Sequence, residues 1–271
     1  MSLEKFEKTN GIKKQFYRNG PSHRDGADVT FGDIVKIFKF RTAKIGAWVN
    51  KQEQQVAANL FFDALCDLMT ILQVNEQVIS LRGTLSIAFG SGGNRYSSAH
   101  YNSATRTIAL AKNAGPGSLA HEYFHGFDHF ITSRFFKKSG TDDFASSLWL
   151  QRGMVVEHPL NNLLESCYQH IFLKPDSDEP SDVFKRSVQA DKALGSYYYA
   201  LPQEISARAF ESFVQDNPIK NQFLVRGTKQ SVEARLGVYP SGNEREIISR
   251  HFSNYFCMLG KAVENTEVLR N

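Results

Sequence analysis

Apolar residues recur at helical spacing in several stretches of the chain. The first stretch covers residues 52–72, where one stripe of a helix would carry Val56, Leu60, Ala64, Leu68 and Ile71. The same spacing predicts later helices at residues 161–172, 181–194, 203–215 and 243–259. Pro202 begins the third of these, and proline is well tolerated in the first turn of a helix. The second half of the chain is therefore expected to be mainly helical.

Short apolar runs bounded by turn-forming residues predict strands in the first half of the chain. They cover residues 85–89, 100–101 and 107–111. Residues 31–49 mix apolar and basic positions and are expected to pack on the elements that follow. Residues 1–30 are charged and show little periodicity, which predicts a flexible arm ahead of one domain that spans residues 31–271. A few strands followed by helices are typical of an α+β fold.

Composition and charge narrow the class of protein. Of the 271 residues, 41% are hydrophobic and 22% are charged, as in ordinary soluble globular proteins. The net charge of +4 is mild and no basic block dominates, so binding to nucleic acid has only weak support. No apolar run approaches the length of a membrane span, and residues 1–20 lack an apolar signal region. We therefore expect a cytoplasmic protein with no membrane partner.

The cysteines exclude two kinds of stabilisation. Cys66, Cys167 and Cys257 are widely spaced and form no C-x-x-C pair, which argues against a disulfide framework and against a thiolate zinc site. Cys66 and Cys257 have apolar neighbours and are expected to be buried thiols.

Residues 117–130 read G-S-L-A-H-E-Y-F-H-G-F-D-H-F and contain the most specific chemical pattern of the chain. They follow an apolar run and a cluster of glycine, asparagine and proline, so a helix is expected to begin near Ser118. His121 and His125 are four residues apart and would share one face of that helix, where both imidazoles can bind one metal ion. Glu122 stands beside them and can deprotonate a water molecule at that ion. This H-E-x-x-H pattern is typical of zinc hydrolases.

A catalytic zinc site normally has three protein ligands and one open position, so a third ligand must come from elsewhere. Glu204, in the first turn of the helix that begins at Pro202, is the first candidate. Glu211 lies seven residues later on the same face of that helix and is the second. His129 is the third, although its offset of eight residues from His121 is awkward for binding one ion from a single helix. Zn²⁺ is the expected cofactor in each case.

Two further positions are candidates for supporting roles. Asp128 lies three residues after His125 and would either accept a hydrogen bond from that imidazole or face the solvent. A tyrosine near the metal could donate a hydrogen bond to the oxyanion that forms during hydrolysis. Three tyrosines stand at residues 197–199, and we assign this role to Tyr197 and expect the other two to pack.

At these residues the chain resembles known metallopeptidases. H-E-x-x-H followed by E-x-x-x-x-A-F, which here begins at Glu204, is similar to the gluzincin metallopeptidases, especially those of the anthrax lethal factor type. The resemblance implies Glu122 as general base, Glu204 as third zinc ligand and Tyr197 as the tyrosine of the site. Arg208 departs from the pattern because that family carries an acid there, so the role of that acid does not transfer.

A broader resemblance covers about residues 31–216. F-R-T-A-K-I-G-A-W-V at residues 40–49, the H-E-x-x-H stretch and L-P-Q-E-I-S-A-R-A-F-E-S-F-V at residues 201–214 resemble a metallopeptidase-like domain of the large polyvalent proteins of phages and conjugative elements. This resemblance implies a zincin-like fold and an association with mobile genetic elements. It identifies no substrate.

These observations predict a zincin-like α+β protein, with a small mixed sheet beside the metal helix, that binds zinc through His121, His125 and Glu204. Glu122 would activate the water that attacks a peptide bond, so the partner would be a peptide or protein substrate. A short edge strand at residues 85–89 or 107–111 would align an extended substrate by main-chain pairing.

Two alternatives come from other classes of protein. One is a metal-stabilised binding module of a mobile genetic element that binds DNA or a host protein without cleaving it, and a steep salt dependence of DNA binding would favour it. The other is a pro-enzyme or toxin whose arm at residues 1–30 covers the cleft. The sequence leaves the oligomeric state open.

Overall fold

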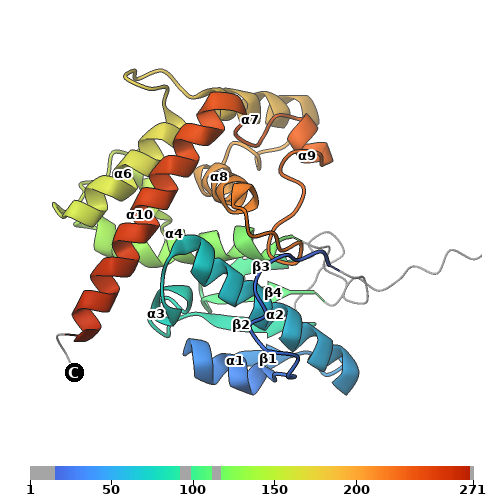
Figure 1. The fold of residues 1–271 in the computed structure, drawn as a ribbon. Helices are drawn as coiled ribbons and strands as arrows, with labels where there is room; N and C mark the ends of the chain where they lie inside the picture. The colour runs from blue at the N-terminus through green and yellow to red at the C-terminus, as the bar shows by residue number, and fades with distance from the viewer. Residues whose placement is uncertain (1–15, 92–98, 112–116, 269–271) are drawn as a thin grey trace, which may run out of the picture.

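The computed structural model describes residues 16–91, 99–111 and 117–268, in which a small sheet lies beside a mainly helical part (Figure 1). The sheet contains β1 (Ala43–Ile45), β2 (Ser86–Phe89), β3 (Ala99–Asn102) and β4 (Thr107–Leu110). Its strand order is β1-β2-β4-β3, with β1, β2 and β4 parallel and β3 antiparallel to β4. The prediction of an α+β fold with a small mixed sheet is confirmed.

The two predicted edge strands lie inside the sheet. Ala109 of β4 pairs with Ala88 of β2 on one side and with His100 of β3 on the other. β2 likewise pairs with β1 and β4. The prediction that residues 85–89 or 107–111 form an edge was therefore wrong, because both strands are occupied on both sides. Among the described residues, β3 forms the edge next to the metal helix.

Three helices precede or follow the first strands: α1 (Phe31–Phe38), α2 (Lys51–Leu72) and α3 (Glu76–Ile79). The helix predicted at residues 52–72 is confirmed as α2, which begins at a capping box formed by Asn50 and Glu53. Most of the predicted stripe is buried, because Ala64, Leu68 and Ile71 lie in the core, but Val56 is exposed. The buried face also includes Phe61, whose ring lies 6.2 Å from that of Phe89 in β2. By length and composition alone α2 could cross a membrane, but 56% of its most apolar window is buried inside the protein, as expected for a core helix.

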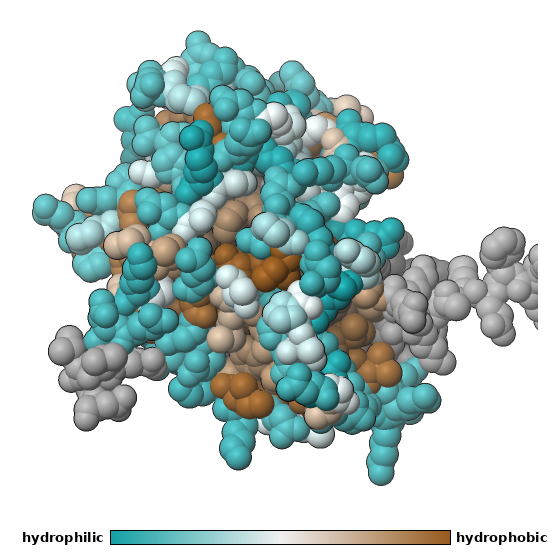
Figure 2. Space-filling view, in the orientation of Figure 1, coloured by the Kyte–Doolittle hydropathy of each residue, from teal (hydrophilic) through white to brown (hydrophobic). Residues whose placement is uncertain are grey.

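The helical part follows the sheet in the chain. It consists of α4 (Leu119–Phe135), α5 (Ala145–Leu150), α6 (Pro159–Phe172), α7 (Asp182–Leu194), α8 (Pro202–Asp216), α9 (Val232–Arg235) and α10 (Gly242–Val268). The predicted helices correspond to α4, α6, α7, α8 and α10. α10 runs along α6 and also contacts α8 (Figure 1). On the face shown in Figure 2, hydrophilic residues cover most of this helical part, and apolar residues gather where it meets the strand-containing part.

An aromatic cluster joins α4 to α8 and α10. The rings of Phe124 and Phe210 are stacked 4.9 Å apart, and Phe252 contacts both edge-on at 5.6 and 5.7 Å. All three side chains are fully buried. Burying a phenylalanine contributes about 1.5–3 kcal/mol, so this cluster is a substantial reason why α8 lies alongside α4. That packing brings the start of α8 next to the H-E-x-x-H residues of α4.

Residues 16–30, part of the predicted arm, lie against α2. The Arg18 guanidinium donates two hydrogen bonds, of 2.6 and 2.7 Å, to the buried carboxylate of Asp67. His23 and Asn221 also contact that carboxylate, each at 2.8 Å, and the Asn19 amide donates to a carbonyl of the loop after α8. This segment is therefore anchored to α2 and to the loop after α8. Residues 1–15 lie outside the described part of the chain.

The three cysteines are free thiols, as the sequence predicts. Cys167 is fully buried, but Cys66 and Cys257 are only half-buried. The expectation of full burial for those two was wrong, because each lies on a side of its helix that is partly turned to solvent.

Candidate metal site

The start of α4 is held in place by a loop that lies about a hundred residues later in the chain. Gly117 has a positive φ of 98°, and a Cβ atom there would stand 2.4 Å from the backbone nitrogen of Arg226. The Ala120 amide donates a 3.0 Å hydrogen bond to the Leu224 carbonyl. Ser118 is the N-cap residue, as expected, but its side chain makes no capping hydrogen bond. Tertiary contacts therefore fix this helix end, and only glycine fits the approach.

His121 and His125 converge on Glu204 of α8. The Nε2 atoms of the two histidines each lie 3.3 Å from a different carboxylate oxygen of Glu204, and their ring centroids are 4.6 Å apart. One donor atom from each residue lies within 4.8 Å of the other two. Two imidazoles and one carboxylate are a ligand set of catalytic zinc sites, which keep a fourth position open. The residues present fit a zinc ion.

The other two candidate ligands have different partners. Glu211 accepts a 3.0 Å hydrogen bond from Nδ1 of His121, on the side of the ring away from Glu204, and Tyr239 donates to the same Glu211 oxygen over 3.2 Å. Both ring nitrogens of His129 are engaged at 2.7–2.8 Å, by the Tyr101 hydroxyl and the carbonyl of residue 141. The structure therefore brings Glu204 to the histidines, places Glu211 behind His121 and keeps His129 apart.

Charges around this group shift the pKa values of its members. Burial alone would raise the pKa of Glu204, but hydrogen bonds to His121 and His125 hold it well below its usual range. Burial opposes the charge on His121, yet the carboxylates of Glu211 and Glu204 raise the pKa of this imidazole well above its usual range. The carboxylates of Glu204 and Glu211 therefore favour a positive charge at His121.

Glu122 lies beside the two histidines and is 8% exposed. Burial raises the pKa of its carboxyl group, and the nearby charges of His121 and His125 oppose that shift. A hydrogen bond from the Tyr101 backbone amide in β3 also opposes it. The carboxylate is thus held between the metal helix and the edge strand.

Asp128 takes neither of its two predicted positions. It is fully buried and accepts hydrogen bonds from the Ser146 amide, the Ser146 hydroxyl and the Tyr168 hydroxyl over 2.5–2.9 Å. It therefore joins α4 to α5 and α6 instead of contacting His125 or facing the solvent. Nδ1 of His125 is buried and has no hydrogen-bond partner in the described part of the chain.

The tyrosine beside Glu204 is Tyr198, not Tyr197. The Tyr197 side chain is 94% exposed, so its assignment to the site was wrong, whereas Tyr198 lies close enough to Glu204 for that carboxylate to influence its phenol. Burial raises the pKa of Tyr198, and the charge of Glu204 raises it further. The buried carboxylate of Asp191 accepts hydrogen bonds from three successive amides, those of residues 198–200, and so fixes the backbone of the turn that precedes α8. Tyr198 is 46% exposed there.

Arg208 holds that turn against Glu204. It is 3% exposed and donates to Glu204 over 3.4 Å and to the Tyr199 carbonyl over 2.5 Å. Its guanidinium carbon lies 5.6 Å from the ring centre of Tyr198. Arg208 departs from the family pattern, but the sequence also predicts that it pairs with a group of the site in a structural role, and its i,i+4 spacing from Glu204 on a helix accounts for this pair.

Comparison with known proteins finds a similarity to one family over part of the chain. Residues 190–263 match a family model described as large polyvalent protein-associated domain 1. This segment contains Glu204, Arg208, Glu211 and Tyr239 but not the H-E-x-x-H helix. No curated protein and no solved structure matches the chain. The match supports the link to large polyvalent proteins that the sequence resemblance implies.

Proposed function

We propose that the protein is a zinc-dependent peptidase with a zincin-like fold. The observation that carries the proposal is the convergence of His121, His125 and Glu204 next to the buried carboxylate of Glu122. A zinc ion held by the three ligands would lower the pKa of a water molecule and polarise a peptide carbonyl. The substrate would be a peptide or protein.

Glu122 is the general base of the proposed reaction. Its elevated pKa, which burial causes, suits a group that accepts a proton from water and then donates it to the leaving amine near neutral pH. Glu211 and Tyr239 would orient His121 through its Nδ1 atom and fix which ring nitrogen faces Glu204.

Tyr198 is the oxyanion donor in this proposal. Its high pKa keeps the phenol protonated at neutral pH, so its hydroxyl can donate a hydrogen bond. The Tyr198 side chain is partly exposed, so its hydroxyl would be open to the oxyanion of a bound substrate.

β3 is the strand that would align the substrate. It is the described edge strand next to α4, and its Tyr101 amide already points at Glu122. An extended peptide that adds to this edge would place its main chain beside the base and the metal ligands.

Zinc content and hydrolysis, measured on the same preparations, test the proposal. Elemental analysis should find near-stoichiometric zinc in the wild type and in Glu122→Gln, and little in Glu204→Ala. A peptide library should be cleaved by the wild type and by the control Glu246→Gln, which changes an exposed acid on α10. We expect Glu122→Gln to lose about 10²–10⁴-fold in rate.

Two outcomes would contradict the proposal. Turnover retained by Glu122→Gln would remove the assigned base. Stoichiometric zinc in a wild-type protein that cleaves no library member would favour the metal-stabilised binding module.

A further inference from the structure

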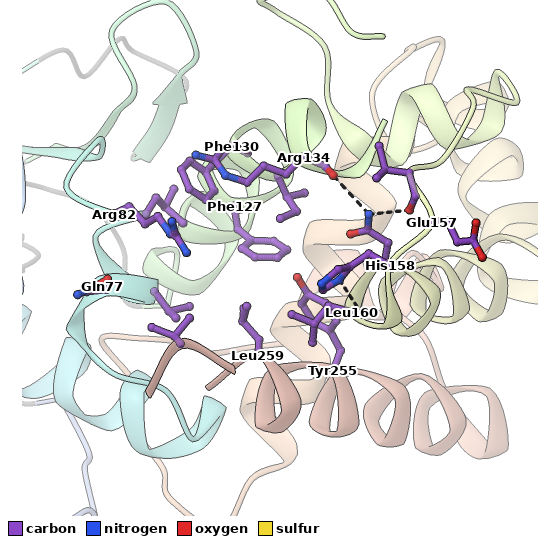
Figure 3. Close-up of a pocket in the computed structure, with 16 residues that line it drawn as sticks. Gln77, Arg82, Phe127, Phe130, Arg134, Glu157, His158, Leu160, Tyr255 and Leu259 are labelled. Carbon is purple, nitrogen blue, oxygen red and sulfur yellow. Dashed lines mark hydrogen bonds between the residues drawn. The ribbon is translucent and has the colours of Figure 1, made fainter. Parts of the chain in front are cut away.

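A cavity of about 310 Å³ lies on the side of α4 that faces away from the metal site (Figure 3). Phe127, Ile131 and Arg134 of α4 form one wall. At about 100° per residue, these positions lie on roughly the opposite face of the helix from His121 and His125. The remaining apolar wall comes from three other parts of the chain and comprises Val78, Leu81, Leu160, Tyr255, Leu259 and Val263.

The size and lining of the cavity suit a small molecule. Ligand pockets in proteins usually measure about 300–1,000 Å³ and are lined mostly by apolar side chains with a few polar groups. This cavity is at the lower end of that range and its walls are mainly apolar. Phe127 lies at its centre, with Leu259 and Tyr255 of α10 facing it (Figure 3). A ligand here would need a compact apolar body.

Two arginines supply charge to the cavity. Arg82 and Arg134 both line it at the exposed surface, and neither forms an ion pair with a carboxylate in the part of the chain that the structure describes. The Arg134 guanidinium lies 4.0 Å from the ring centre of Phe130, and its hydrogen bond goes to a backbone carbonyl. Partial burial lowers the pKa of Arg134, and the neighbouring charge of Arg82 lowers it further. Glu157 lies at the other end of the cavity from Arg82 (Figure 3).

We propose that this cavity binds a small amphiphilic anion. The apolar body would lie against Phe127 and Leu259. The head group, a carboxylate or a phosphate, would lie at Arg82 and Arg134. Guanidinium groups suit this role because their planar donors bind such oxygens in pairs. The inference does not rest on the proposed peptidase activity.

Isothermal titration with decanoate and with decanol, both below their aggregation concentrations, tests the proposal. We expect one decanoate per chain, bound at least about tenfold more tightly than decanol, which corresponds to about 1.4 kcal/mol. The double variant Arg82→Gln/Arg134→Gln should lower decanoate affinity to that of decanol and leave decanol unchanged. Arg250→Gln, which changes an exposed arginine of α10 outside the cavity, is the matched control and should bind like wild type.

A second variant separates the cavity from surface charge. Leu259→Trp should fill the cavity and abolish binding of both compounds, with far-UV circular dichroism and melting used to verify its fold. Equal affinity for decanoate and decanol, or decanoate binding that survives the double arginine substitution, would overturn the proposal. So would binding to phosphatidylglycerol vesicles without binding of free decanoate, because the arginines would then serve a membrane surface.

Discussion

Replacing Glu211 tests how the metal site is organised. The Glu211 carboxylate contacts Nδ1 of His121 over 3.0 Å, while Nε2 of the same ring faces Glu204 over 3.3 Å. Glu211 is therefore expected to orient a ligand without being one. Removing such an outer partner typically lowers metal affinity 10–100-fold, whereas removing a ligand destroys the site. Glu211→Gln keeps the shape of the side chain and removes only its charge. The zinc affinity of this variant should therefore fall about tenfold, or about 1.4 kcal/mol.

Competition with a chromogenic zinc chelator measures these affinities directly. Glu211→Ala should approach a 100-fold loss because it removes the hydrogen bond as well as the charge. Tyr239→Phe, which removes only the hydroxyl that donates to Glu211, should have the smallest effect of the three. Glu246→Gln serves as the control for loss of one negative charge. Two results would refute the role of Glu211 as a partner of His121 that does not bind the metal. One is a zinc affinity of Glu211→Ala equal to that of wild type, and the other is a loss of zinc binding as complete as in Glu204→Ala.

Three more predictions follow from the packing and the charges. Phe210→Ala should lower the free energy of unfolding by about 3–5 kcal/mol in a denaturant titration, because it empties part of the aromatic cluster between α4 and α8. The control Tyr197→Ala, at an exposed position, should have a free energy of unfolding within about 0.5 kcal/mol of wild type. Tyr198→Phe should lower kcat by about 10²–10³-fold and Tyr197→Phe should leave it unchanged, and the reverse order would restore the original assignment. Burial opposes ionisation of Asp191, but hydrogen bonds from Ser196 and three backbone amides lower its pKa to about 2. Folding therefore favours the charged form of Asp191. Wild type should melt at a higher temperature than Asp191→Asn, with the full difference above about pH 4 and none as the pH falls towards 2. A difference in melting temperature that persists at pH 2 would contradict this cause.

Local sequence signals were sufficient for most helices and strands of this fold. The long apolar period predicts α2, and Pro202 marks the start of α8. The signals failed where tertiary contacts decide the outcome. Periodicity places Val56 on the buried stripe of α2, but the sheet meets the neighbouring face that carries Phe61. Which strand forms the edge depends on pairing, and the short run at residues 99–102 shows no sign of it.

The site was predictable where its residues are neighbours on one helix. His121, Glu122 and His125 follow from their spacing, and Glu204 was reached only by weighing three candidates. Asp128 shows the limit: three residues after His125 it has the right offset for a contact, yet Ser146 and Tyr168 satisfy its carboxylate. The prediction of Tyr197 fails for a similar reason. Asp191 fixes the turn at residues 198–200, and no local pattern shows which tyrosine then lies near Glu204.

The division of the site between two parts of the chain explains why packing decides its assembly. The histidines and Glu122 lie on α4, next to the sheet, whereas Glu204, Arg208 and the groups behind His121 lie in the segment at residues 190–263 that matches the polyvalent-protein domain. Neither half holds three ligands by itself. The Phe124 and Phe210 stack is the contact that sets the distance between them. The matched segment therefore contributes one carboxylate to the proposed site and α4 contributes the two imidazoles, so any change in the spacing of these two helices acts directly on that site.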